Sequence, residues 1–261
     1  MGNKDACLIY DATGKLMKGT ELITDINTAC KPIIVNLTGS NKYALITLNN
    51  TNTPNYHIID MNLLGYGTMV NAGEVENTLI NQPLTTNTTA QYGLHFTGFE
   101  DHVNGKTVVY TTRYVPLIPN GEGITEIVAY EFTGANTTPQ EHVLYSLNSC
   151  ADTKQGELQI AQDGTKLLWY HHNEYVAGFN HRVAQIYEIE LDASKTAITG
   201  NVEMINTSAA GNFGNGNVEG GTNSSDILYA QRGVYKEAKT QDPLQKTEKN
   251  VWKYDPINEV V

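Results

Sequence analysis

The densest group of side chains that could bind a ligand or move a proton lies between positions 169 and 175. The candidate ligand-binding residues in it are Trp169, His171, His172, Glu174 and Tyr175. Aromatic rings stack on the apolar faces of sugars, and imidazole and carboxylate groups hydrogen-bond to hydroxyls, so the cluster would suit carbohydrate binding and is the best candidate site. In the interpretation favoured over this one, these are polar residues that line a loop. The cluster does not indicate a metal site, because adjacent histidines on a strand point to opposite faces of the sheet.

A second polar cluster surrounds the string FEDHVNG at 99–105, and His95 lies just upstream of it. His102 is its candidate ligand-binding residue, with Glu100, Asp101 and Asn104 as neighbours. Calcium loops alternate oxygen ligands as in DxDxDG, and this string does not, so no metal is predicted.

No cofactor is predicted for this chain. The glycine-rich string at 214–220 opens no helix, and neither a P-loop nor a nucleophile elbow is present. Three scattered cysteines, Cys7, Cys30 and Cys150, are too few for a zinc site or a disulfide framework. One disulfide with a free thiol and three separate thiols both remain open.

An apolar residue followed by an acid recurs along the chain. The acids of these pairs are Asp11, Asp60, Glu131, Glu188 and Asp255. Alternation along a strand places each acid on the face opposite its apolar neighbour, which predicts a structural role in a sheet with one packed and one polar face. In the alternative interpretation, two of these carboxylates converge and hydrolyse glycosidic bonds.

Residues 156–205 contain the run GELQIAQ, the turn Asp163-Gly164, the run KLLWYHH and two further β-rich runs. Asp-Gly between alternating runs predicts a hairpin, and the whole unit predicts a four-stranded antiparallel meander. Similar units recur about every 60 residues, which is typical of a β-propeller. The predicted class is therefore all-β, a propeller or partial propeller of about four to five four-stranded blades.

The blades are predicted to form one propeller-like domain over residues 1–261. Their expected limits are 7–23 for a half blade, then 32–80, 91–147, 156–205 and 218–261. The terminal strands do not obviously complement one another, so a segment of a larger propeller is favoured over a closed five-bladed ring.

Charge and hydropathy limit the partners. The formal net charge of −11 repels phosphate backbones and anionic lipid, so nucleic acid is excluded as an expected partner. No apolar run reaches the length of a membrane span. The expected partners are protein domains of the same or another chain, and glycans.

Three runs carry a resemblance to a protein family: YALITLNNTNTPNYHIIDMNLLGYGTMV, QYGLHFTGFEDHVNGKTVVYTTRY and GELQIAQDGTKLLWYHHN. They resemble propeller blades of large secreted or surface proteins of Bacteroidota, including RHS/YD-repeat and gliding-motility-associated proteins. IYDATGKL and KYDPINEV are similar to YD repeats. The resemblance implies an extracellular or cell-surface, non-catalytic module and assigns no functional residue.

The function predicted from these observations is a non-catalytic binding or scaffolding propeller that contacts partner domains or ligands through its rim loops. The alternative is a glycan-active hydrolase or lyase with a central Asp/Glu/His site. The alternative predicts that several of His95, His102, His171, Asp101 and Glu174 converge in one pocket.

Overall fold

The computed structural model describes most of the chain between residues 8 and 254. The described residues are 8–63, 73–75, 79–87, 89–116, 123–134, 138–149, 157–173, 183–200, 202–207, 216–220, 227–233 and 248–254. The chain divides into two compact units, each described by itself below. The first comprises Met1–Thr88, Gly98–Val109 and Tyr130–Glu141, and the second comprises Thr89–Thr97, Tyr110–Ala129 and His142–Val261.

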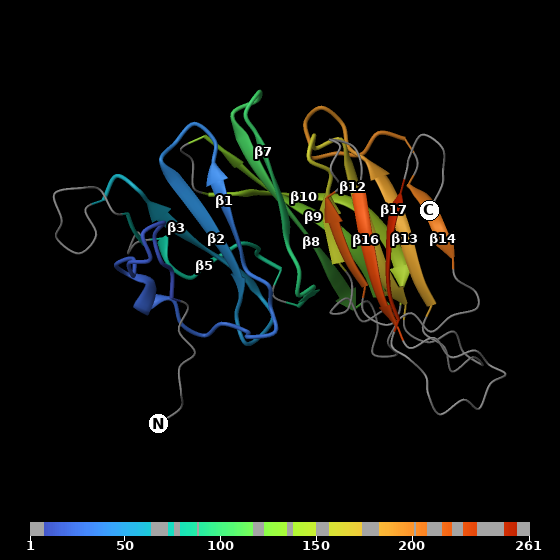
Figure 1. Cartoon of the computed structure of the whole chain (residues 1–261), viewed down its shortest axis with the longest axis horizontal. Helices are drawn as coiled ribbons and strands as arrows, with labels where there is room; N and C mark the ends of the chain where they lie inside the picture. The colour runs from blue at the N-terminus through green and yellow to red at the C-terminus, as the bar shows by residue number, and fades with distance from the viewer. Residues whose placement is uncertain are drawn as a thin grey trace. The chain divides into compact units, whose positions relative to one another are not determined.

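The first sheet is an antiparallel meander in the first unit (Figure 1). Its strands are β1 (Ile33–Leu37), β2 (Lys42–Leu48), β3 (Pro54–Asp60), β4 (Glu74–Val75) and β5 (Gln82–Pro83). β4 and β5 pair with opposite ends of β3. β2 and β3 are buried along most of their length. The run ALITL predicts this for β2, while β3 also buries polar side chains.

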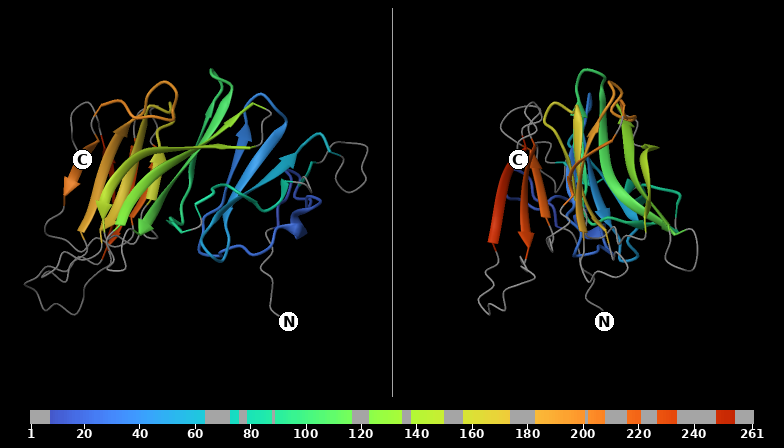
Figure 2. Two further views of the ribbon diagram at one scale, coloured as in Figure 1. Left: turned by 180° about the vertical axis from the view of Figure 1, so that it is seen from behind. Right: turned by 90° about the vertical axis from the view of Figure 1, so that its right-hand side faces the viewer.

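The second sheet has long central strands that contribute to both units. Its strands are β6 (Gln91–Tyr92), β7 (Thr97–Asp101), β8 (Lys106–Pro116), β9 (Gly123–Thr133) and β10 (Gln140–Ser149). β6 and β7 both pair with β8, whose first nine residues are all buried. Figure 2 shows the twist of these long strands from two further sides.

The third and fourth sheets lie in the second unit and continue the same plan. The third contains β11 (Glu157–Ile160), β12 (Lys166–Asn173), β13 (Val183–Glu190) and β14 (Glu203–Thr207) in that order. The fourth contains β15 (Gly216–Gly220), β16 (Ile227–Gly233) and β17 (Glu248–Tyr254). The predicted hairpin at Asp163-Gly164 joins β11 to β12, with Gly164 at a φ of 68°.

The class predicted from the sequence is confirmed: the chain is all-β, with successive antiparallel meanders of the propeller-blade type. Among the described residues the only helical element is a single 3-10 turn, η1 (Thr20–Leu22). None of their helices could cross a membrane. Whether residues 1–261 form one domain stays a prediction.

The N-terminal segment closes the core of the first sheet. Ile9, Met17 and Ile23 are buried against Leu45 and Ile59. The backbone N–H of Val75 donates to the carbonyl of Lys18 at 2.9 Å, which ties the segment to β4.

Gly19 sits at this junction with a φ of 86°, and a Cβ there would lie 2.9 Å from the carbonyl oxygen of Val75. We therefore expect Gly19→Ala to destabilise the protein by about 2 kcal/mol, from the left-handed backbone and the steric clash together. Gly14→Ala is the matched control, because Gly14 has a φ of 78° and no atom within 4 Å. Denaturant unfolding should show the larger loss for Gly19→Ala; equal losses would exclude a contribution from the Val75 contact.

Candidate functional site

The turn between β7 and β8 is the best-defined surface feature that carries sequence-predicted site residues. We call residues Glu100–Gly105 the rim turn. Val103 at its apex is 94% exposed, and the side chain of His102 is 70% exposed. The turn thus presents its side chains to solvent from the end of two paired strands.

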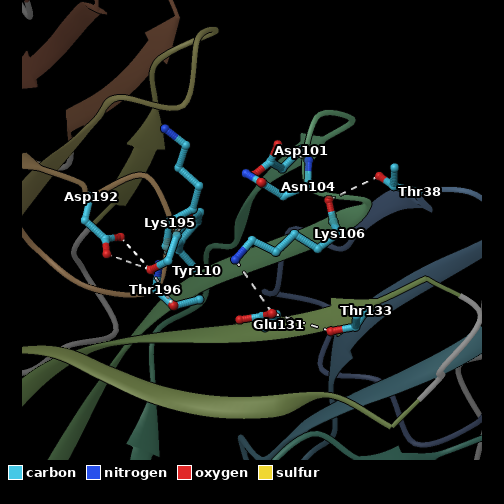
Figure 3. A network of polar contacts seen from close by, with 11 residues as sticks. Thr38, Asp101, Asn104, Lys106, Tyr110, Glu131, Thr133, Asp192, Lys195 and Thr196 are labelled. Carbon is cyan, nitrogen blue, oxygen red and sulfur yellow. Dashed lines mark hydrogen bonds and ion pairs between the residues drawn. The ribbon is translucent and has the colours of Figure 1, made fainter.

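Asp101, a buried member of the rim turn with 4% exposure, fixes the conformation of the turn through its hydrogen bonds. Its carboxylate accepts a hydrogen bond from the backbone N–H of Asn104 at 3.1 Å and one from the Asn104 side chain at 2.7 Å. Burial by itself raises the pKa of Asp101, but the Asn104 hydrogen bonds and the charge of Lys106 outweigh it and hold that pKa below its ordinary value. Asp101 is therefore a structural anion beneath the turn, as Figure 3 shows.

Glu100 is the second fixed group. One carboxylate oxygen accepts the backbone N–H of Asn36, in β1, at 3.0 Å, and the other lies 3.6 Å from Nε2 of His102. The Glu100 side chain remains 37% exposed. A carboxylate in a set orientation beside an exposed imidazole provides hydrogen-bond acceptors and donors for a polar ligand.

The base of the rim turn is connected to neighbouring strands. Thr107 donates to the carbonyl of Asn36 at 2.6 Å, and Thr38 donates to the carbonyl of Lys106 at 3.2 Å. The ammonium of Lys106 lies 3.7 Å from Glu131, whose other neighbour in Figure 3 is Thr133. The turn is therefore attached to β1 and β9 as well as to its own hairpin.

The first predicted cluster is only partly described. Trp169 is 1% exposed, stacks on Tyr187 with ring centroids 5.2 Å apart, and meets the edge of Tyr145 at 6.4 Å. Burial raises the pKa of Tyr187, and the neighbouring Tyr145 adds to that rise. Trp169 thus packs in the core of the third sheet, while its ligand role stays a prediction.

The remaining members of that cluster are His171, His172, Glu174 and Tyr175. His171 and His172 lie in β12, where their backbones pair with Gln185 and Ala184 of β13, and Glu174 and Tyr175 lie outside the described residues. The predicted convergence of His95, His102, His171, Asp101 and Glu174 in one pocket also stays a prediction. Within the described ranges, no group of three or more His, Cys, Asp or Glu could hold a metal ion.

Three of the recurring acids are explained by lysines that each begin a neighbouring strand, β2, β8 or β12. Lys42 lies 3.2 Å from Asp60, Lys106 lies 3.7 Å from Glu131, and Lys166 lies 2.6 Å from Glu188. These pairs are largely buried, which supports the structural interpretation over a catalytic carboxylate pair for all three acids. Asp255 lies outside the described residues.

The Lys42–Asp60 pair shows how a neighbouring lysine affects the pKa of a partly buried carboxyl. Burial alone raises the pKa of Asp60, but hydrogen bonds from Asn62 and Lys42, with the charge of Lys42, keep it below its ordinary value. A sequence signal was available for these pairs: a turn containing Gly precedes each lysine by one to three residues.

The ion pair between Arg113 and Glu126, in the second unit, was not predicted from the sequence. Nε of Arg113 is 2.6 Å from Oε2 of Glu126, and Nη1 donates to the hydroxyl of Tyr92 at 3.3 Å. Arg113 is 5% exposed. With the guanidinium occupied in this way, the pair is best explained as a link between β6, β8 and β9.

Comparison with known proteins finds similarity only among solved structures: no family model matches and no curated protein matches. A thermostable family-43 glycoside hydrolase is 10% identical with a TM-score of 0.39, over 77% of this chain and 64% of that one. An exo-β-1,3-galactanase from Phanerochaete chrysosporium is 10% identical with a TM-score of 0.44, over 88% and 47%. A GH43 β-1,3-galactosidase is 11% identical with a TM-score of 0.46, over 88% and 73%. This chain therefore spans less than two thirds of the length of the first two.

We expect Lys166→Met to destabilise the protein by about 2 kcal/mol, because it leaves the Glu188 carboxylate buried without its cation. The double variant with Glu188→Leu should recover most of that loss. Lys18→Met is the control, since the Lys18 side chain is 45% exposed beside Glu74, and we expect a change of about 0.5 kcal/mol or less. Denaturant unfolding measures all four proteins, and equal losses for the two single variants would contradict a buried structural pair.

Proposed function

We propose that this chain is a glycan-recognising β-propeller protein and that the rim turn is one of its glycan contacts. The observation that carries the proposal is the Glu100 carboxylate, held by the N–H of Asn36, beside the exposed imidazole of His102. Sugar hydroxyls both donate and accept hydrogen bonds, so an oriented carboxylate next to an imidazole suits them. Pre-organisation reduces the entropy lost when a ligand binds.

The electrostatics of the turn favour a neutral or cationic sugar over an anionic one. The chain has a net charge of −11, and the turn places Glu100 and Asp101 side by side in sequence. A uronic acid or sulfated glycan would meet like charge there, which costs binding energy. The proposed ligand is therefore an uncharged oligosaccharide.

Cleavage of the same glycan is the second candidate function. A carboxylate and an imidazole 3.6 Å apart and open to solvent are group types that can transfer protons. The three acids of the lysine pairs are not proposed for this role, because their carboxylates already neutralise lysines inside the sheets.

Binding is tested by isothermal titration calorimetry against a panel of neutral oligosaccharides. The panel includes β-1,3-galactotriose, the ligand named for a galactanase of similar fold. We expect Glu100→Gln and His102→Ala each to raise Kd about tenfold, the loss of one hydrogen bond to a charged group. Glu21→Gln, which removes an exposed carboxylate elsewhere in the first unit, should leave Kd unchanged.

The proposal fails if no neutral oligosaccharide binds or if both rim-turn variants bind like the unmodified protein. Release of new reducing ends by the unmodified protein, lost in Glu100→Gln, would assign cleavage. Binding without any release of reducing ends would assign recognition alone.

A further inference from the structure

His57 lies in the middle of β3 and is 0% exposed. Its Nε2 is 2.9 Å from Oγ1 of Thr47 in β2, and its Nδ1 accepts the backbone N–H of Asn81 at 3.0 Å. Because Nδ1 accepts a hydrogen bond, the ring is neutral and carries its proton on Nε2. One buried imidazole thus connects the body of the first sheet to a peripheral segment.

That segment, Asn81–Thr85, is called the strap. It contains the two-residue strand β5, which pairs with Asn55 and Tyr56 of β3, and Leu84 donates to the carbonyl of Pro54 at 2.9 Å. Asn81 starts it at a φ of 52° and is exposed, as is Pro83, whereas Leu84 and Thr85 are buried. Thr47, on the other side of the ring, is 1% exposed in a seven-residue strand. β2 pairs with β3 at seven positions and the strap pairs with β3 at two, so the strap is the partner of His57 that can open at the lower cost.

Proton uptake by His57 is incompatible with this arrangement. A second ring proton, on Nδ1, would face the Asn81 N–H, so two donors would point at each other. The imidazolium charge would also be buried without a counter-ion. Opening of the strap removes the Asn81 N–H from the second ring proton and lets water hydrate the imidazolium charge.

The charged groups on the elements around the ring do not supply a counter-ion for a protonated His57. Lys42 and Asp60 of β2 and β3 pair with each other at the far end of those strands. Glu141 accepts a hydrogen bond from Thr85 at the end of the strap. Burial raises the pKa of Tyr56 in β3, so its hydroxyl supplies no counter-charge at neutral or acid pH.

We propose that His57 is a pH-sensitive latch, which holds the strap on β3 when its ring is neutral and releases the strap when the ring takes up a proton. Release leaves the outer edge of β3 unpaired where β5 had covered it. An unpaired strand edge is a surface on which another strand can add. The latch thus couples acid pH to exposure of one sheet edge in the first unit.

The size and direction of the effect follow from linkage. Burial lowers the pKa of His57 from 6.5 to about 4 while the strap is closed. The open form binds the proton more readily, so the closed form is fully stabilised above about pH 6.5 and loses that stabilisation as the pH falls toward 4. Between pH 7 and pH 5 the strap-opening equilibrium is expected to rise about 20-fold.

Hydrogen exchange followed by mass spectrometry tests the latch, with rates at pH 7 and pH 5 corrected for intrinsic chemical exchange. In the unmodified protein we expect peptides covering the strap to lose about 20-fold protection at pH 5, while peptides of β2 keep theirs. His57→Gln, which hydrogen-bonds but does not titrate, should remove the pH dependence. His102→Gln, at an exposed histidine, should leave it intact.

A measurement on the unmodified protein keeps the test decisive if His57→Gln does not fold. NMR titration of the ring protons should give His57 a midpoint well below the ordinary histidine value of 6.5, and strap amides should shift with that midpoint. The proposal is overturned if strap protection is the same at both pH values, if β2 loses protection equally, or if His57 titrates at its ordinary value.

Discussion

A lysine paired with a carboxylate on the adjacent antiparallel strand is the interaction that most of this structure depends on. It recurs in three sheets, at Lys42–Asp60, Lys106–Glu131 and Lys166–Glu188. A buried charge without a partner is costly, so each pair penalises any strand register that separates its two members. A shift of one residue would turn the carboxylate to the other face and leave the lysine buried alone.

The second constraint is the edge of each sheet, where backbone groups need partners. In the first unit Glu100 accepts the N–H of Asn36 in β1, and Thr107 accepts the N–H of Thr38, the residue that follows β1. In the second unit Thr97 does the same for Ile160 of β11. Side chains that end a sheet edge in this way also prevent unwanted strand addition. Glu100 therefore serves the fold with one oxygen and faces the proposed ligand site with the other.

The two proposals place function at two short segments of the first unit that each combine exposed and buried residues. The rim turn is exposed but anchored by buried Asp101, which suits a binding surface that must keep its shape. The strap is short, pairs with β3 at only two positions and is attached through His57, which suits a segment that opens. A carboxylate whose pKa is held below its ordinary value thus fixes the rim turn, whereas a titratable ring holds the strap.

The sequence by itself determined the strands, the tight turns and the antiparallel meanders, because alternation and turn residues act over a few positions. It also marked the recurring acids as structural and His102 as a surface residue of a hairpin turn. Only the tertiary structure decided which side chains meet. Asn36 and Glu100 are 64 residues apart, His57 and Asn81 are 24 apart, and no local pattern encodes either contact. Trp169 shows the same limit: no local pattern encodes its stacking on Tyr187 or the burial of its ring, because both depend on the neighbouring strand.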